Sequence, residues 1–198
     1  MKITKVEVFQ FRCEVAIPNK PVGCRIYTDE GIYGDGEGSM SYGTGSEAAF
    51  GMIEALANMI IGMDPLDNEV IWDKMHRSTF WGQSPGPVVF SGMSAIDLAL
   101  WDIKGKSFGA PVYELMGGKC RDNIKVYSWI GGDRPADTGA MAKERKDAGF
   151  TAIKMNATEE LQMIDTYDKV DAVLERVAAI RETCGKYFGI AIDFHGRV

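Results

Sequence analysis

Asp193 and His195 stand two residues apart at the end of the apolar run 188–192. Side chains alternate between the two faces of a β-strand, so residues at this spacing point to the same side. A carboxylate can hold a hard cation, and an imidazole can give or take a proton near neutral pH. We therefore interpret the pair as a candidate reaction centre at the tip of a strand.

Lys154 and Asn156 repeat this spacing at the end of a second apolar run, residues 150–155. Lysine is rarely placed beside a protein core without a partner or a function. If the two strands are parallel neighbours, all four side chains meet at one carboxyl edge of the sheet. Parallel α/β proteins place their chemistry at this edge.

The elements after Gly118 alternate between strands and helices. The pattern predicts strands over residues 124–130, 150–155 and 188–194, and helices over residues 133–148 and around 170–180. This alternation predicts a parallel sheet covered by helices. We therefore divide the chain at Gly118 into a first domain, residues 1–118, and a second domain, residues 119–198.

The first domain places its strands before its helices, which predicts an α+β fold. Strands are expected over residues 3–9, 24–28 and 32–34, with a turn at residues 29–31. Helices are expected from a capping box at residues 44–47, from Asp64 and Pro65, over residues 92–106, and from Pro111 to Gly117. Residues 15–22 contain two prolines and predict a loop that could act as a lid.

Other motifs are better explained by structural roles. Residues 43–48 fit a loose G-x-G-x-x-A pattern, but neither the buried strand before it nor the acid-tipped strand after it is present. His76 lies among basic residues and reads as a surface side chain. The tryptophans are expected in the core or at a domain interface: Trp72, Trp81, Trp101 and Trp129. For Trp81, the lining of a pocket is the alternative.

The composition is that of a soluble globular protein, with 198 residues, 45% of them hydrophobic, and a net charge of -6. Without a basic cluster, nucleic acid and an anionic membrane surface are not expected partners. No apolar run is long enough to span a bilayer. The four cysteines form no C-x-x-C pair, which indicates free thiols, and we expect a cytoplasmic protein.

Two long segments are similar to a known family. Residues 94–106 and 110–118 closely resemble the segment that joins the capping domain to the barrel in the mandelate racemase branch of the enolase superfamily. Residues 127–137 and 193–198 further resemble the bacterial acid-sugar dehydratases of that branch. The resemblance covers the whole chain and is weakest over residues 13–50.

The resemblance implies an α+β capping domain followed by a modified TIM barrel. Asp193 would be the first of three carboxylate ligands of Mg²⁺, and His195 would protonate a departing hydroxyl group. Lys154 and Asn156 would occupy the Lys-x-Lys positions that bind substrate in the racemases. Because Asn156 replaces the second lysine, a racemase with two bases is disfavoured. The implied partners are a small-molecule sugar acid and, in the full-length protein, further copies of the same chain.

The implied reaction is the elimination of water from a sugar acid, which gives a 2-keto-3-deoxy acid. Only 80 residues, 119–198, follow Gly118, whereas a closed barrel typically needs about 250. We therefore expect an N-terminal portion with an incomplete barrel, inactive by itself. The alternatives are another sugar-acid dehydratase, a racemase or epimerase of the same branch, and a non-catalytic module with exposed strand edges.

Overall fold

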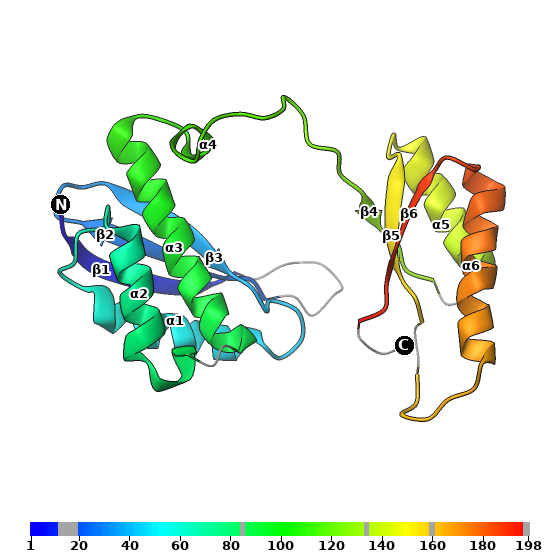
Figure 1. The fold of residues 1–198 in the computed structure, drawn as a ribbon, viewed down its shortest axis with the longest axis horizontal. Helices are drawn as coiled ribbons and strands as arrows, with labels where there is room; N and C mark the ends of the chain where they lie inside the picture. Colours follow the sequence, from blue (N-terminus) through cyan, green and yellow to red (C-terminus); the bar gives the residue numbers. More distant parts are fainter. Residues whose placement is uncertain (12–19, 84–85, 133–134, 159–160, 196–198) are drawn as a thin grey trace. The chain divides into compact units, whose positions relative to one another are not determined.

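The computed structural model describes residues 1–11, 20–83, 86–132, 135–158 and 161–195. The chain forms two compact units, Met1–Cys120 and Arg121–Val198 (Figure 1). The boundary expected after Gly118 falls two residues before this division. Each unit has its own hydrophobic core.

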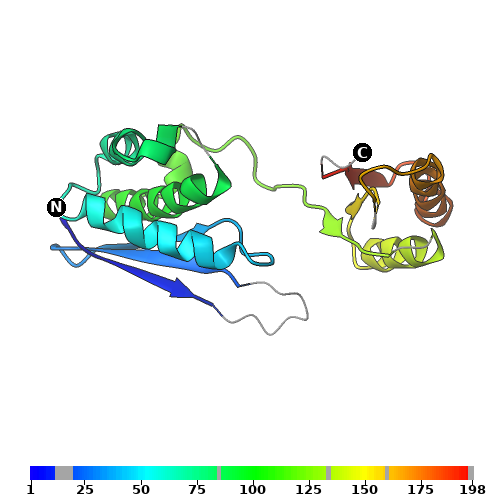
Figure 2. The same ribbon diagram turned by 90° about the horizontal axis from the view of Figure 1, so that it is seen from below.

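The first unit is an antiparallel sheet covered by helices on one face. Its strands pair in the order β1 (Ile3–Gln10), β2 (Val22–Thr28) and β3 (Tyr33–Gly38). Its helices are α1 (Ser46–Ile60), α2 (Asn68–Ser78), η1 (Phe80–Gln83), α3 (Pro87–Phe108) and α4 (Val112–Leu115). The helices α1 and α3 pack on the sheet, and α2 packs on both of them (Figure 2). This arrangement confirms the predicted α+β fold.

The central strand β2 shows why this face is buried. Val22, Cys24 and Ile26 alternate along the strand and are fully buried against the helices. Arg25 and Tyr27 point to the other face and remain partly exposed. The period of two in the sequence therefore separates a core face from a polar face.

The third strand is longer than predicted. The sequence predicts that this strand ends at Gly34, but β3 continues to Gly38. A Cβ atom on Gly36 would lie 1.9 Å from the carbonyl oxygen of Ala95 on α3. The glycines thus permit close packing of helix on strand, and their low strand propensity hid this role in the sequence.

Helix starts differ from the predicted ones. The helix α1 begins at Ser46 after Gly45, without a side-chain capping hydrogen bond, so the capping box expected from Thr44 is wrong. The helix α2 begins at Asn68 instead of following Asp64. Asp64 accepts a hydrogen bond of 2.9 Å from the amide of Leu66, which closes a turn before the helix. Of the expected lid, residues 15–22, the part 15–19 lies outside the described residues.

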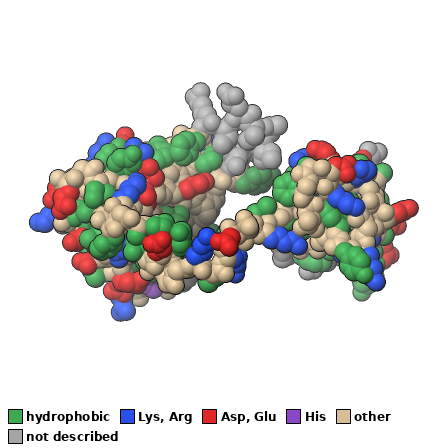
Figure 3. Space-filling view, turned by 90° about the horizontal axis from the view of Figure 1, so that it is seen from above, with side chains coloured by type: hydrophobic (Ala, Val, Ile, Leu, Met, Phe, Trp, Pro, Cys, Tyr) green, Lys and Arg blue, Asp and Glu red, His purple; other side chains and the backbone are tan. Residues whose placement is uncertain are grey.

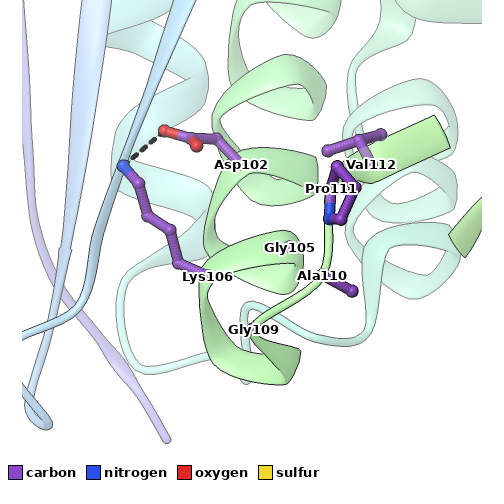
Figure 4. Close-up of a pocket in the computed structure, with 7 residues that line it drawn as sticks. All are labelled: Asp102, Gly105, Lys106, Gly109, Ala110, Pro111 and Val112. Carbon is purple, nitrogen blue, oxygen red and sulfur yellow. Dashed lines mark hydrogen bonds and ion pairs between the residues drawn. The ribbon is translucent and has the colours of Figure 1, made fainter. Parts of the chain in front are cut away.

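Side chains of α3 bind the open edge of β3. The Asp35 amide donates to Oδ2 of Asp102 over 3.0 Å, and Nζ of Lys106 donates to the Tyr33 carbonyl oxygen over 2.8 Å. Asp102 and Lys106 also pair with each other at 2.6 Å (Figure 4). The two side chains therefore satisfy main-chain groups that a further strand would otherwise bind.

The second unit is a three-stranded parallel sheet with two helices. The strands pair in the order β4 (Ser128–Trp129), β5 (Ala152–Asn156) and β6 (Gly189–Asp193). The helices α5 (Pro135–Asp147) and α6 (Asp168–Cys184) connect them and lie side by side (Figures 1 and 2). This order confirms the predicted α/β arrangement.

Two details of the second unit differ from the sequence reading. The strand β4 has two residues, whereas Ile124 and Val126, expected within it, are 75% and 61% exposed. The sequence predicts an apolar face on α6 that includes Val170, Val173, Leu174 and Ile180, but Val170 and Leu174 are exposed. The buried residues of this helix are Val173, Arg176, Ile180 and Cys184. Because one of the buried positions is occupied by an arginine, the apolar residues in the sequence indicate a different face of the helix.

Charged side chains of both signs lie on one face of the first unit. On the face shown in Figure 3, acidic and basic side chains of the first unit are interspersed with apolar ones. Among the described residues, no helix combines the length and apolar character that crossing a bilayer requires.

Candidate active site at the strand ends

The sheet of the second unit has one apolar and one polar face. Ile153 and Met155 of β5 are buried against the helices. Lys154 and Asn156 alternate with them and therefore point to the opposite face. Asn156 pairs in register with Asp193 of β6, so these two side chains share that face. The alternation places three of the four candidate residues on the side away from α5 and α6.

Lys154 and Asp193 form an ion pair. Nζ of Lys154 lies 2.6 Å from Oδ2 of Asp193, and the two side chains are 23% and 31% exposed. The hydrogen bond from Lys154 is the main reason that the pKa of the Asp193 carboxyl is lowered, and the amide of His195 contributes next. Asp193 is therefore a carboxylate at neutral pH.

His195 follows the last residue of β6 by two positions and folds back on Asp193. Its backbone amide donates to Oδ1 of Asp193 over 2.9 Å, and its Nε2 atom lies 3.2 Å from Oδ2. The backbone turns here with φ of 50°, a left-handed conformation that histidine adopts more readily than most residues. The turn thus places the imidazole beside the carboxylate, with nearly half of it exposed to solvent.

Asn156 lies on the neighbouring strand. Its Oδ1 atom is buried and has no hydrogen-bond partner among the described residues. The next residue, Ala157, donates its amide to the Asp193 carbonyl oxygen over 2.8 Å. Because an unpaired buried acceptor is unfavourable, Oδ1 is suited to receive a donor from a bound molecule.

Trp129 is a site-facing residue that the sequence reading missed. It pairs in register with Lys154, and its neighbour Ile130 is fully buried in the helix-covered core. The indole therefore faces the same side as Lys154, and it is 51% exposed, so it does not lie in the core, which was one of the two positions expected for it. The sequence could have predicted this position, because side chains alternate along a strand and the neighbouring Ile130 is an apolar core residue.

The other candidates do not join this cluster. Trp81 lies in η1 and is 70% exposed. His76 is half-buried and stacks on Phe90 with ring centroids 6.4 Å apart, so it is not the free surface residue expected. An open groove of about 410 Å³ lies at the end of α3, and its lining contains none of the four candidate residues (Figure 4).

A metal ion would find one carboxylate in this cluster. Asp193 is ionised and partly exposed, which fits one oxygen ligand of Mg²⁺. Within the part of the chain that the structure describes, no three His, Cys, Asp or Glu residues come together as a complete site. Further ligands would have to come from other residues.

Residues 14–117 match the N-terminal domain of the mandelate racemase / muconate lactonizing enzyme family. This match spans more than half of the chain. The chain belongs to this family. Over its entire length it is 43% identical to the D-galactonate dehydratase of Pectobacterium atrosepticum, of which it covers 49%. The chain thus spans about half the length of this curated relative.

Solved structures of the enolase superfamily have the same fold. A member from Salmonella Typhimurium is 38% identical and matches 98% of this chain and 55% of its own, with a TM-score of 0.87. An enolase from Pantoea ananatis, solved with bound D-gluconate and Mg, is 27% identical and matches all of this chain and 54% of its own, with a TM-score of 0.82. The predicted capping domain and incomplete barrel are confirmed.

Proposed function

We propose that this sequence forms part of the active site of a magnesium-dependent sugar-acid dehydratase. The proposed reaction converts D-galactonate into 2-dehydro-3-deoxy-galactonate. The observation that carries the proposal is the cluster of Lys154, Asp193 and His195 at the ends of β5 and β6. The similarity to a D-galactonate dehydratase supports the choice of substrate.

Removing a proton next to a carboxylate is difficult because a second negative charge develops on the carboxylate oxygens. Lys154 places its ammonium group at the polar face of the sheet, where it can stabilise this charge. A bound Mg²⁺, with Asp193 as one of its ligands, would act as a Lewis acid on the substrate carboxylate. Lys154, which pairs with Asp193, would stabilise the same developing charge.

His195 is suited to the second half of the reaction. Hydroxide is a poor leaving group, so the β-hydroxyl group needs a proton as its bond to carbon breaks. The imidazole can supply this proton because it is partly exposed at the strand end and held by the Asp193 carboxylate. Asp193 would orient the ring.

Asn156 would bind the substrate without acting as a base. An amide does not titrate near neutral pH, so the residue cannot remove a proton from this side. Its unpaired Oδ1 atom would accept a hydrogen bond from a substrate hydroxyl group. The base would come from residues other than these four.

The test is an assay for 2-keto acid formation from D-galactonate, with and without Mg²⁺. The chain is assayed alone and after recombination with the C-terminal half of a barrel. Product from a different hexonate would keep the reaction class and change the substrate. Solvent deuterium exchange without water loss would instead favour a racemase or epimerase, and failure with every hexonate would contradict the proposal.

A further inference from the structure

A buried arginine underlies the candidate site. Arg176 lies on the inner side of α6, between Val173 and Ile180, and is only 3% exposed. A buried guanidinium is unfavourable unless its donors are satisfied. The position therefore requires specific acceptors, and the structure shows acceptors for Nη1 and Nη2.

The guanidinium binds main-chain carbonyl groups at the ends of two strands. Its Nη2 atom donates to the carbonyl oxygen of Ala157, the residue after β5. Its Nη1 atom donates over 3.4 Å to the carbonyl oxygen of Gly132, three residues after β4 ends at Trp129. One planar group thus contacts the chain just beyond both strands.

The third strand is connected through the same peptide chain. The amide of Ala157 donates to the Asp193 carbonyl oxygen over 2.8 Å, while the carbonyl group of Ala157 accepts from Arg176. The two hydrogen bonds belong to successive peptide groups that are joined at the Cα atom of Ala157. The resulting path leads from Arg176 to Asp193 and passes directly beside Asn156.

We propose that Arg176 is a positioning residue that holds the carboxyl ends of β4, β5 and β6 in the arrangement the reaction needs. This inference rests on the proposed function. Arg176 would act on the site through the two main-chain carbonyl groups that it binds. Because reaction rates fall steeply when reacting groups move by about 1 Å, loss of this anchor affects turnover more than binding.

Arg181 provides a matched control on the same helix. Its Nη1 atom donates to the carbonyl oxygens of Lys186 and Phe188, just before β6 begins at Gly189. It therefore makes the same kind of contact at the amino end of a strand, away from Asp193. Arg181→Met removes a helix-to-loop anchor without changing the carboxyl ends.

The first measurement is amide hydrogen exchange at Ala157 in this chain. Arg176→Met is expected to speed exchange at Ala157 by about tenfold relative to the middle of β5, because its anchor is lost. Arg181→Met is expected to leave this ratio unchanged. Unchanged exchange at Ala157 in Arg176→Met would overturn the inference, whatever the protein catalyses.

The second measurement is steady-state kinetics in the recombined enzyme, well below each variant's unfolding temperature. Arg176→Met is expected to lower kcat by about tenfold or more, with KM changed less than about threefold. Arg176→Lys keeps the charge without the planar fork and should recover part of kcat. A kcat in folded Arg176→Met equal to that of Arg181→Met would refute the positioning role, even with faster exchange.

The two proposals fail in different ways. If the wild-type enzyme dehydrates no sugar acid, the proposed function is wrong, and exchange at Ala157 still decides whether Arg176 anchors the strand ends. If Arg176→Met does not fold, Arg176→Lys takes its place in both measurements. If Arg176→Lys then shows wild-type exchange at Ala157 and a wild-type kcat, the planar guanidinium is not needed to hold the strand ends, and the inference is overturned.

Discussion

Nζ of Lys154 and Oδ2 of Asp193 lie 2.6 Å apart, which joins the ends of two adjacent parallel strands. His195 approaches the same carboxylate oxygen at 3.2 Å. Asp193 is thus the common partner of two groups that carry, or can carry, positive charge. This relationship makes the polar face of the sheet suitable for stabilising an anion.

Replacing Lys154 should reduce catalysis strongly. Lys154→Met keeps the length of the side chain and removes the charge that would stabilise the developing anion. We expect kcat for dehydration to fall by about 100-fold or more, with a smaller change in KM. Lys125→Met, which removes an exposed lysine elsewhere in the unit, should retain wild-type kinetics.

Replacing His195 should separate the two halves of the reaction. In His195→Asn, water loss should slow by about 10²–10⁴-fold, because the leaving group no longer receives a proton. Exchange of the substrate's α-proton with solvent deuterium should continue, because the proposed mechanism assigns removal of that proton to another residue. Parallel loss of exchange and dehydration would argue against the role of His195 as the proton donor.

Gly36→Ala should destabilise the first unit. Its new methyl group would meet the Ala95 carbonyl oxygen at 1.9 Å, so α3 would have to move away from β3. We expect the free energy of unfolding to decrease by at least about 1–3 kcal/mol in urea titrations. Gly51→Ala, in an open position on α1, should instead increase it by about 0.5–1 kcal/mol. Equal effects would show that close packing is not the reason for the glycine.

The pair of Lys20 and Glu47 should make stability depend on acid pH. Nζ of Lys20 lies 2.8 Å from Oε1 of Glu47, and this bond, followed by one from Ser46, lowers the Glu47 pKa to about 2. Because folding lowers this pKa from its ordinary value of 4.5, the carboxylate stabilises the folded protein at pH values above 4.5. This stabilisation is lost as the pH falls toward 2.

The corresponding measurement compares urea midpoints of wild type and Glu47→Gln between pH 2 and pH 7. The midpoints should differ above pH 4.5 and converge near pH 2, by a modest amount because the pair is exposed. The same substitution in a Lys20→Met background should show a smaller pH dependence. A constant difference at all pH values would contradict this role of the pair.

The strand-end cluster could be predicted from the sequence because it depends on local rules. Alternation places Lys154 and Asn156 on one face, and strand–helix alternation makes their strand a parallel neighbour of the one that ends in Asp193. His195 required more, because it lies beyond the strand and returns through a left-handed turn. The spacing in the sequence correctly predicted that His195 lies beside Asp193, although the backbone at His195 is not extended.

Features that depend on packing between distant segments could not be predicted. A glycine such as Gly36 is compatible with a loop as well as with a strand, so the local sequence does not predict which it forms. Its role follows from the close approach of α3. Arg176 interrupts an apolar stripe, and its acceptors at Gly132 and Ala157 are defined by the fold alone. The sequence predicts Trp129 in the core or at a domain interface, whereas its register with Lys154 places it on the polar face of the sheet.

The most direct test of the account is the activity of Asp193→Asn in the recombined enzyme with Mg²⁺ and D-galactonate. The substitution keeps the shape of the side chain and removes the negative charge that pairs with Lys154 and would bind the metal. We predict that magnesium-dependent formation of the 2-keto acid falls below detection while the protein remains folded. A folded Asp193→Asn enzyme with the wild-type rate would contradict the placement of the active site at these strand ends.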